Sequence, residues 1–374
     1  MENSSNIKTK FKLRELGGAF GDWGTLIPFV IGYISIVGLN PAGIFICLGM
    51  TNIILGLKHN LPLPVQPQKT IGSIALADGW SSSLVISTGF GTGIVWAILG
   101  LSKKLNKIVS KVPIITVKAI QFGLSLILGW TAIEFISQNF FLGFISIIII
   151  LSLYKFEAFP SAIILTLLGI FILIFSGSFQ ISISLFSFPD FQFFIPDGWN
   201  LLFGMLIAGI AQLFLTLTNV MIATVALVKE FFPEKQDFDA NILATNMGGI
   251  NLISPFLGGI PLCHGSGGLA SQYAFGARNG GSMIFEGIIE LFLGFFLSKA
   301  IFMIFSNFPL SIFGAMLLYT SILLAKIGFN SIKTSWIPII LICGIICFFA
   351  NIAIGFLACL VLYFLLRKRF DLDE

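Results

Sequence analysis

Two short stretches of this 374-residue sequence combine residue types that could bind an anion. The first, LPLPVQPQK at 61–69, sets prolines beside two glutamines and a lysine. The second, GGIPLCHGSGG at 258–268, sets a cysteine, a histidine and a serine among glycines. The first N–H groups of an α-helix have no acceptor within the helix and carry partial positive charge. A helix that starts within either stretch would therefore offer an anion site.

The prolines of the first stretch limit where a helix can start. Each proline removes a backbone donor and pushes the preceding residue toward extended geometry, so helix is expected only from about Pro67 onward. Residues 68–77, QKTIGSIALA, then form roughly ten residues or about 15 Å of helix, which is half the hydrocarbon thickness of a bilayer. We expect the N-terminus of this helix near the membrane midplane, where Lys69 adds a full positive charge.

The second stretch repeats this form, with a proline and then a run that can become helical from about Gly265 and extend to Arg278. Its glycines allow the backbone to approach a ligand closely. The simpler alternative is a pair of Pro/Gly kinks with Lys69 reaching an interface. Irregular backbone at membrane depth is tolerated only inside protein or beside a cavity, so its occurrence twice at matching positions favours a binding site. The residues assigned to this site are Gln66, Gln68, Lys69, Cys263, His264, Gly265 and Ser266.

A polar helix face is expected beside this site. The segment AGIAQLFLTLTN at 208–219 places Gln212, Thr216 and Asn219 about one turn apart on one face. We assign Gln212 and Thr216 to the substrate site. The alternative is that these side chains only bond to neighbouring helices.

An acidic residue lies inside the first apolar segment. GAFGDWGTLIP at 18–28 contains Asp22, for which pairing with Lys69 or capping a helix is favoured over carrying a coupling proton. The candidates for cation coupling are Asp22 and His264. No metal site is expected at Cys263 and His264, because two adjacent side chains do not assemble one.

The composition defines the kind of protein that holds these residues. The chain is 56% hydrophobic and 10% charged with a mean hydropathy of +1.00, whereas soluble domains carry about 25% charged residues. It is therefore an all-α integral membrane protein. About fourteen elements are expected, as two inverted halves of seven with short third and tenth elements. They are placed at 16–38, 41–58, 61–79, 82–101, 112–133, 139–154, 158–176, 199–228, 238–256, 257–277, 282–304, 307–326, 334–349 and 351–366.

The basic residues predict the orientation of the chain. The net charge of +4 comes from lysines and arginines in short loops, which stay in the cytoplasm, so no nucleic-acid partner is implied. Both termini are expected in the cytoplasm of a cell that carries this multi-pass protein in its plasma membrane. They carry Lys8, Lys10 and Lys12 at one end and Arg367, Lys368 and Arg369 at the other.

One loop without Lys or Arg divides the sequence into halves. Residues 177–198 contain Asp190 and Asp197 and are expected outside the cell. The halves are then membrane repeat 1 at 1–176 and membrane repeat 2 at 199–374, which together form a single transport unit without a cytoplasmic regulatory domain. The five cysteines all lie in apolar surroundings, and no disulfide is expected.

Four stretches resemble the molybdate transporter family, which is related to sulfate permeases within the sulfate permease and nucleobase transporter-like superfamily. They are GDWGTLIP at 21–28, LPLPVQPQKTI at 61–71, AQLFLTLTN at 211–219 and PLCHGSGGLASQYAFGARNG at 261–280. The resemblance implies import of a tetrahedral oxyanion, molybdate foremost. It carries binding roles to Gln66, Lys69, Gln212, Cys263, His264, Gly265 and Ser266. Gln68 replaces an expected methionine and Trp23 a smaller aliphatic residue, so tungstate and sulfate stay open as substrates.

Import of a dianion into a negative-inside cell requires an energy source. The membrane potential opposes entry by about 2.3 kcal/mol per charge per 100 mV, or roughly 4.6 kcal/mol for molybdate. We therefore expect a symporter that couples uptake to at least two H⁺ or Na⁺ and works by alternating access. The expected partners are the oxyanion, the coupling cation and membrane lipid; the oligomeric state, a homodimer included, is left open.

Three other functions were weighed. An anion channel would differ in following voltage without cation coupling. A nucleobase permease would resemble its relatives in having acidic residues on the eighth and tenth elements, and 199–228 and 261–277 contain none. An enzyme is disfavoured, because no paired carboxylates, Ser/His/Asp set or metal-ligand cluster emerges, and no cofactor is expected.

Overall fold

The computed structural model describes residues 13–105, 113–153, 161–177, 188–189, 193–329, 332–350 and 352–370. Lys8, Lys10, Lys12 and Asp190, on which the expected orientation partly rests, lie outside the described residues. The first half contains α1 (Leu13–Ala19), α2 (Trp23–Ser35), α3 (Pro41–His59), β1 (Val65–Pro67), α4 (Lys69–Asp78), α5 (Ser82–Ser102), α7 (Ile114–Ser137), α8 (Phe140–Leu153) and α9 (Ser161–Phe175).

The second half begins with α10 (Gly198–Gly204), which Asp197 caps by accepting a hydrogen bond from the Asn200 N–H at 2.8 Å. It continues with η2 (Met205–Gly209), α11 (Ile210–Thr216), η3 (Leu217–Ile222), α12 (Ala223–Phe231), α13 (Ala240–Ile253), η4 (Ser254–Leu257), β2 (Leu262–His264), α14 (Ser266–Ala274), α15 (Gly281–Phe296), α16 (Ser298–Ser306), α17 (Leu310–Phe329), η5 (Thr334–Trp336), α18 (Ile337–Phe349) and α19 (Ile352–Phe370).

Long apolar helices confirm the membrane class. In the described part of the chain, four helical runs are long and apolar enough to cross a bilayer: Pro41–His59, Ser82–Ser102, Ile114–Ser137 and Gly198–Phe231. The last run contains two π-helical segments, η2 and η3. The predicted single span at 282–304 is instead a bent pair, because α15 and α16 meet at an angle of 83°.

The first predicted span is also broken. Residues 16–38 were expected as one helix, but α1 ends at Ala19 and α2 starts at Trp23. The break lies where backbone approaches backbone: a Cβ at Gly21 would lie 2.8 Å from the Ser271 carbonyl oxygen of α14. Residues 20–22 therefore bring the chain against α14, and Asp22 comes with them.

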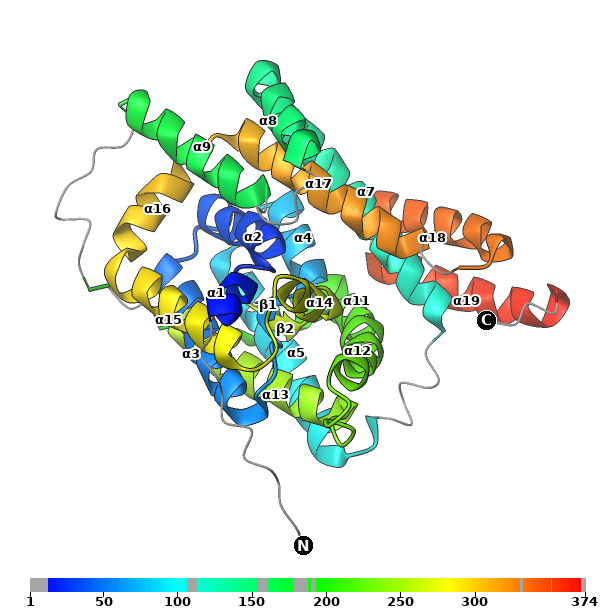
Figure 1. The fold of residues 1–374 in the computed structure, drawn as a ribbon. Helices are drawn as coiled ribbons and strands as arrows, with labels where there is room; N and C mark the ends of the chain where they lie inside the picture. Colours follow the sequence, from blue (N-terminus) through cyan, green and yellow to red (C-terminus); the bar gives the residue numbers. More distant parts are fainter. Residues whose placement is uncertain are drawn as a thin grey trace, which may run out of the picture.

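The helix packing repeats between the halves. In the first half, α3 packs along α15 of the second half. The counterparts of these helices, α13 and α5, pack along each other in the same way, so exchanging the halves turns one pair into the other. Likewise α18 packs on α7 as α8 packs on α17. This is the inverted-repeat arrangement expected from the sequence. In Figure 1, α7, α8, α9, α17, α18 and α19 lie together along one side, and the strands and α14 belong to the other group.

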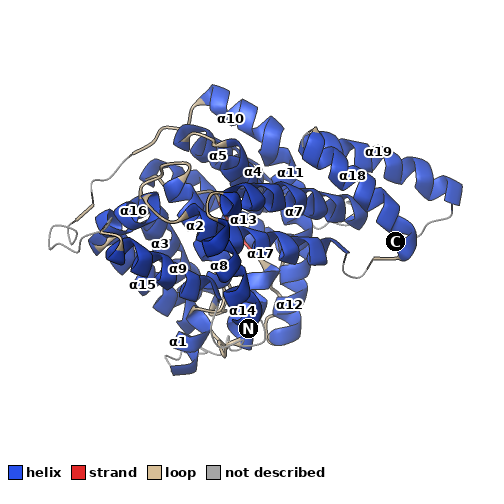
Figure 2. Cartoon of the chain, turned by 90° about the horizontal axis from the view of Figure 1, so that it is seen from above, coloured by secondary structure: helices blue, strands red, loops and turns tan. Residues whose placement is uncertain are grey.

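Two short strands join the halves inside the second group. β1 and β2 pair antiparallel with the register Val65↔His264, Gln66↔Cys263 and Pro67↔Leu262. Viewed from above, helices surround the pair (Figure 2). Each strand leads directly into a short helix, α4 or α14.

The ends of these helices differ slightly from the prediction. α4 covers 69–78 where 68–77 was expected, and α14 starts at Ser266, one residue after the expected start. α14 stops at Ala274, well before Arg278, because Gly276 adopts a φ of +106° and the Ala277 N–H donates back to the Gln272 carbonyl.

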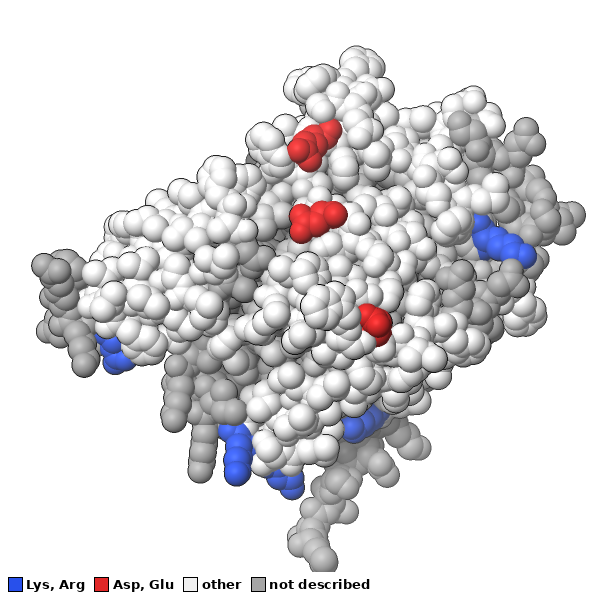
Figure 3. Space-filling model, turned by 180° about the vertical axis from the view of Figure 1, so that it is seen from behind, with Lys and Arg blue, Asp and Glu red and all other residues white. Residues whose placement is uncertain are grey.

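The outer surface has the character of a lipid-facing protein. Many large apolar side chains are exposed, among them Ile98, Phe144, Leu202 and Phe349. The face seen in Figure 3 is largely free of charged side chains, and its lysines and arginines lie toward the lower edge and the sides. Apolar surface bounded by basic residues is typical of a membrane-embedded bundle.

Candidate functional site

The strand pair decides which predicted side chains lie together. Opposed residues of an antiparallel pair point to the same face, and neighbours along a strand point to opposite faces. Gln66 and Cys263 are opposed and share one face, whereas His264 shares the other face with Val65. His264 is fully buried, and its Nδ1 lies 3.4 Å from the Pro64 carbonyl oxygen. The structure therefore groups Gln66 with Cys263 and places His264 apart from them.

The start of α4 combines a positive charge with a fixed backbone. Lys69 is its first residue; the ammonium group acts electrostatically on the Cys263 thiol and has neither a hydrogen bond nor an ion pair within the described structure. The Thr70 N–H, in contrast, already donates to Gln212 Oε1 at 2.7 Å. Gln212 Nε2 in turn donates to Thr216 Oγ1 at 2.9 Å. Gln212 thus binds α4 in the site region, and Thr216 holds the Gln212 side chain from one turn further along its helix.

Two further predicted polar residues are also engaged by protein. Gln68 Nε2 donates to Thr92 Oγ1 at 2.9 Å and to the Leu262 carbonyl oxygen at 3.1 Å, so this side chain links α5 to β2. Asn219 accepts a hydrogen bond from Gln121 Nε2 of α7 at 3.0 Å. It lies in η3, where the helix is π-helical, and it contacts the other helix group.

The start of α14 is open. Gly265 precedes it without any side-chain cap, and the N–H groups of Ser266, Gly267 and Gly268 have no acceptor within the described structure. Gly267 is exposed, and a Cβ built there would meet nothing within 4 Å. Gln66 lies against this turn, because a Cβ at Gly268 would be 3.1 Å from Gln66 Nε2. The first turn of α14 therefore has three backbone donors without an acceptor in the described structure, beside the strand pair.

A tyrosine at this centre was missed by the sequence reasoning. Tyr33 of α2 is fully buried, its hydroxyl group has no partner, and a Cβ at Gly72 of α4 would lie 3.0 Å from that hydroxyl. The hydroxyls of Thr70 and Ser73 on α4 are likewise buried and unpartnered. A lone tyrosine in an apolar helix carries no motif, so only the fold places it beside α4.

Asp22 makes neither of the contacts favoured for it. It occupies the N-cap position of α2 without a side-chain capping bond, and it does not pair with Lys69. Its carboxylate accepts hydrogen bonds from Gln66 Nε2 at 3.1 Å and from Gln272 Nε2 at 3.3 Å. The break between α1 and α2 turns Asp22 toward the strand and α14.

The expectation of no paired carboxylates was wrong. Gln272 Nε2 donates at 2.7 Å to Glu286 of α15 as well as to Asp22, so one amide joins two carboxyl groups. Glu290 follows Glu286 by one helical turn. The signal was present in the sequence, because two acidic residues in an apolar helix are unusual enough to suggest a function.

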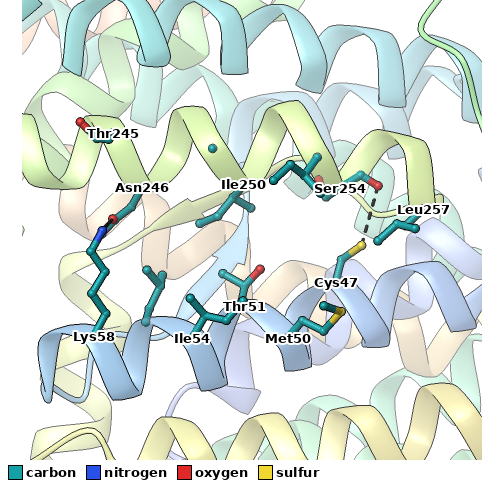
Figure 4. Close-up of a pocket in the computed structure, with 13 residues that line it drawn as sticks. Cys47, Met50, Thr51, Ile54, Lys58, Thr245, Asn246, Ile250, Ser254 and Leu257 are labelled. Atoms are coloured by element: carbon teal, nitrogen blue, oxygen red, sulfur yellow. Dashed lines mark hydrogen bonds between the residues drawn. The ribbon is translucent and has the colours of Figure 1, made fainter. Parts of the chain in front are cut away.

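The outer side of the same helix group has a different character. A cavity of about 320 Å³ lies between α3 and α13, lined by apolar side chains such as Ile54 and Ile250, with Lys58 and Asn246 at one end (Figure 4). The Lys58 ammonium donates to Asn246 Oδ1 at 3.3 Å. None of the predicted anion-site residues lines this cavity.

Solved structures of membrane transporters share this fold. The chain is similar to the transmembrane domain of the cyanobacterial bicarbonate transporter BicA, with a TM-score of 0.64 and 15% identity over 96% of this chain and 98% of that one. It is also similar to the murine anion transporter Slc26a9 solved in the inward-facing state, with a TM-score of 0.69 and 10% identity over 97% of this chain and 69% of that one. The fold is that of a multi-pass membrane transporter.

The sequence comparison gives the family. Residues 14–128 and 204–324 match the family described as "Molybdate transporter of MFS superfamily". Molybdate transporter 2 of Arabidopsis thaliana is 30% identical over 95% of this chain and 87% of its own length, and molybdate transporter 1 of the same plant is 29% identical over 98% and 90%. The chain belongs to the molybdate transporter family, and it is a transporter rather than an enzyme.

Proposed function

We propose that this protein imports molybdate by cation-coupled alternating access, with the anion held where β1 and β2 lead into α4 and α14. One observation carries the proposal: the Lys69 ammonium has no counter-ion in the described structure, and three free backbone N–H groups open the neighbouring helix. A tetrahedral dianion accepts hydrogen bonds at four oxygens, which suits a cluster of fixed donors with one full positive charge.

The proposed contacts divide between the two halves. The N–H groups of Ser266, Gly267 and Gly268 donate to the oxygens of the anion, and Lys69 supplies charge. Gln66 and the Cys263 thiol, which share a face of the strand pair, complete the pocket wall.

The other residues assigned from the sequence do not contact the anion in this proposal. They hold the elements that form the pocket. Gln68, Gln212 and Thr216 hold α4 and β2 in position through the bonds described above. His264 lies on the opposite strand face, and it supports the strand through Pro64.

Alternating access requires one helix group to move against the other. The site lies in the group that contains both strands, and a cavity of about 740 Å³ separates the C-terminal end of α4 from α7 and α18 of the other group. α4 is buried from Thr70 to Leu76, whereas Gly267 and Ala274 of α14 are exposed. We place both termini in the cytoplasm of a cell that carries the protein in its plasma membrane. In this orientation, the exposed side of α14 faces the cytoplasm. The two repeats, 1–176 and 199–374, then act as one transport unit.

Binding to the purified full-length protein tests the site and its selectivity. We expect molybdate to bind tightly, to be displaced by tungstate and to be displaced poorly by sulfate or uracil. Preferential sulfate binding would mean that the proposed site is right but that its substrate is sulfate. Preferential uracil binding would favour a nucleobase permease. In proteoliposomes, molybdate flux that follows voltage without any cation gradient would instead identify a channel.

A further inference from the structure

A second polar centre lies beside the proposed anion pocket. The carboxyl groups of Asp22, Glu286 and Glu290 are buried, with exposures of 2%, 1% and 0%. They come from the α1–α2 break and from two successive turns of α15. Buried acidic groups at membrane depth are costly unless they bind something.

Asp22 and Glu286 form a pair that a proton would complete. One amide joins their carboxyl groups, because Gln272 Nε2 donates to both, at 3.3 Å and 2.7 Å. The Trp23 indole N–H donates to the other Glu286 oxygen at 3.1 Å. Two ionised carboxylates joined by one amide repel strongly where the dielectric is low, and one proton removes that repulsion.

Two amide groups of this cluster, those of Gln272 and Asn52, are fixed in orientation and cannot accept that proton. Gln272 Oε1 accepts from Ser282 Oγ at 2.9 Å, and Asn52 Oδ1 accepts from the Val65 N–H at 3.1 Å. Both amides therefore present their NH₂ groups to the carboxyls. For Asn52 the recipient is Glu290, at 2.8 Å.

One carboxylate oxygen of the cluster has no hydrogen-bond donor in the described structure. Glu290 Oε1 is fully buried and has no hydrogen-bond partner among the residues that the structure describes, although Asn52 satisfies the other oxygen of the same carboxyl group. Glu290 lies four residues after Glu286 on the same helix, so the two side chains project from the same face one turn apart. An unpartnered carboxylate oxygen next to a carboxyl pair can bind a second proton.

The surroundings offer no competing cation. Glu286 and Glu290 are the titratable groups that act on Asp22, and α14, α3 and β1 contribute only amides. No described lysine, arginine or histidine forms an ion pair with any of the three carboxyl groups. Glu15 of α1 faces away, toward the backbone N–H groups of Arg278 and Asn279.

The carboxyl cluster connects directly to the anion pocket. Gln66 Nε2 donates to Asp22, and the same side chain lies against the first turn of α14, 3.2 Å from a Cβ built on Gly265. Asn52 links Glu290 to the backbone of β1 at Val65. Because β1 joins the two sites, a change of charge on the cluster changes the electrostatic potential at the pocket.

We propose that Asp22 and Glu286 share the proton that travels with the anion, and that Glu290 is the adjoining acceptor. This inference rests on the proposed function and names its coupling ion. A proton on the pair removes one negative charge beside the dianion, so proton and anion bind cooperatively, and by linkage the affinity for molybdate rises as the pH falls.

Proteoliposomes with a pH-sensitive dye inside test the inference. For the wild type, addition of external molybdate at zero membrane potential should acidify the interior, and net uptake should rise with an inward proton gradient. Glu286→Gln and Asp22→Asn should lose at least tenfold of both signals while exchanging internal for external molybdate at close to the wild-type rate. Glu230→Gln, at an exposed carboxylate of α12, is the matched control and should behave as the wild type.

The outcomes separate the inference from the proposed function. Unchanged proton movement per molybdate in both variants would overturn the inference, as would wild-type uptake that requires Na⁺ and moves no protons. Loss of exchange and of molybdate binding together with the proton signal would also overturn it, since the cluster would then be structural. A wild type that neither binds nor exchanges molybdate would instead refute the proposed function.

Discussion

The starts of α4 and α14 occupy equivalent positions in the two halves, yet they offer different groups to a ligand. α4 begins with Lys69, its second N–H donates to Gln212, and its residues from Thr70 to Leu76 are buried. α14 begins without charge and without a side-chain cap, and Gly267 in its first turn is exposed.

This difference indicates a division of roles between repeats. The Thr70 N–H of α4 is already satisfied by Gln212 and cannot bind the anion, so in the proposed site we expect α4 to contribute chiefly the charge of Lys69. α14 contributes geometry, because fixed N–H groups define where oxygens can lie. In the proposed site, the two halves therefore make unlike contributions, and substitutions in each half should have different effects.

The largest effect is expected from Lys69→Ala. A hydrogen bond to a charged group is worth about 1.5–3 kcal/mol, so molybdate affinity should fall roughly 10- to 150-fold. Isothermal titration of the purified variant measures this. Lys104→Ala, which removes an exposed lysine, is the control, and a Kd for Lys69→Ala within twofold of the wild type would show that α4 does not supply the charge.

A smaller effect on binding, but a clear effect on stability, is expected from Gln212→Leu. The change leaves the buried Thr70 N–H without an acceptor, which costs about 1–3 kcal/mol of folding free energy. Thermal unfolding in detergent should show a lower midpoint than for Gln236→Leu, at an exposed glutamine. If Gln212→Leu weakens molybdate binding more than Lys69→Ala and leaves stability unchanged, Gln212 contacts the anion and not α4.

The smallest effects are expected from a matched pair in α14. Gly267→Ala adds a methyl group in open space and should stabilise the helix by up to about 1 kcal/mol while weakening molybdate binding severalfold, since the methyl group projects beside the free N–H groups. Gly268→Ala places a methyl group 3.0 Å from Pro64 Cγ and should lower both stability and affinity. Equal affinity in Gly267→Ala and the wild type would place the anion elsewhere.

Local rules in the sequence predicted both helix starts within one residue. Pro67 and Gly265 mark them, because proline excludes the preceding backbone from helix and glycine allows an uncapped turn. The positive charge of Lys69 at a helix start followed from the same local pattern. These features depend on residues that are neighbours in the chain.

The contacts of Asp22 could not be predicted in this way. Its partners Gln66 and Gln272 are 44 and 250 residues distant in the chain, and the pair with Glu286 exists only because the first helix breaks against α14. The bend between α15 and α16 was missed for a related reason, since no proline marks it in the sequence.

The sequence by itself determined the membrane class, the inverted halves and the two helix starts, because apolar length and proline positions act locally on the chain. Only the tertiary structure decided that Gln66 and Cys263 share a face without His264, and that Gln212 binds α4. It alone brought three acidic side chains from two halves into one buried cluster. Strand register and helix packing set these contacts, and both depend on residues far apart in the chain.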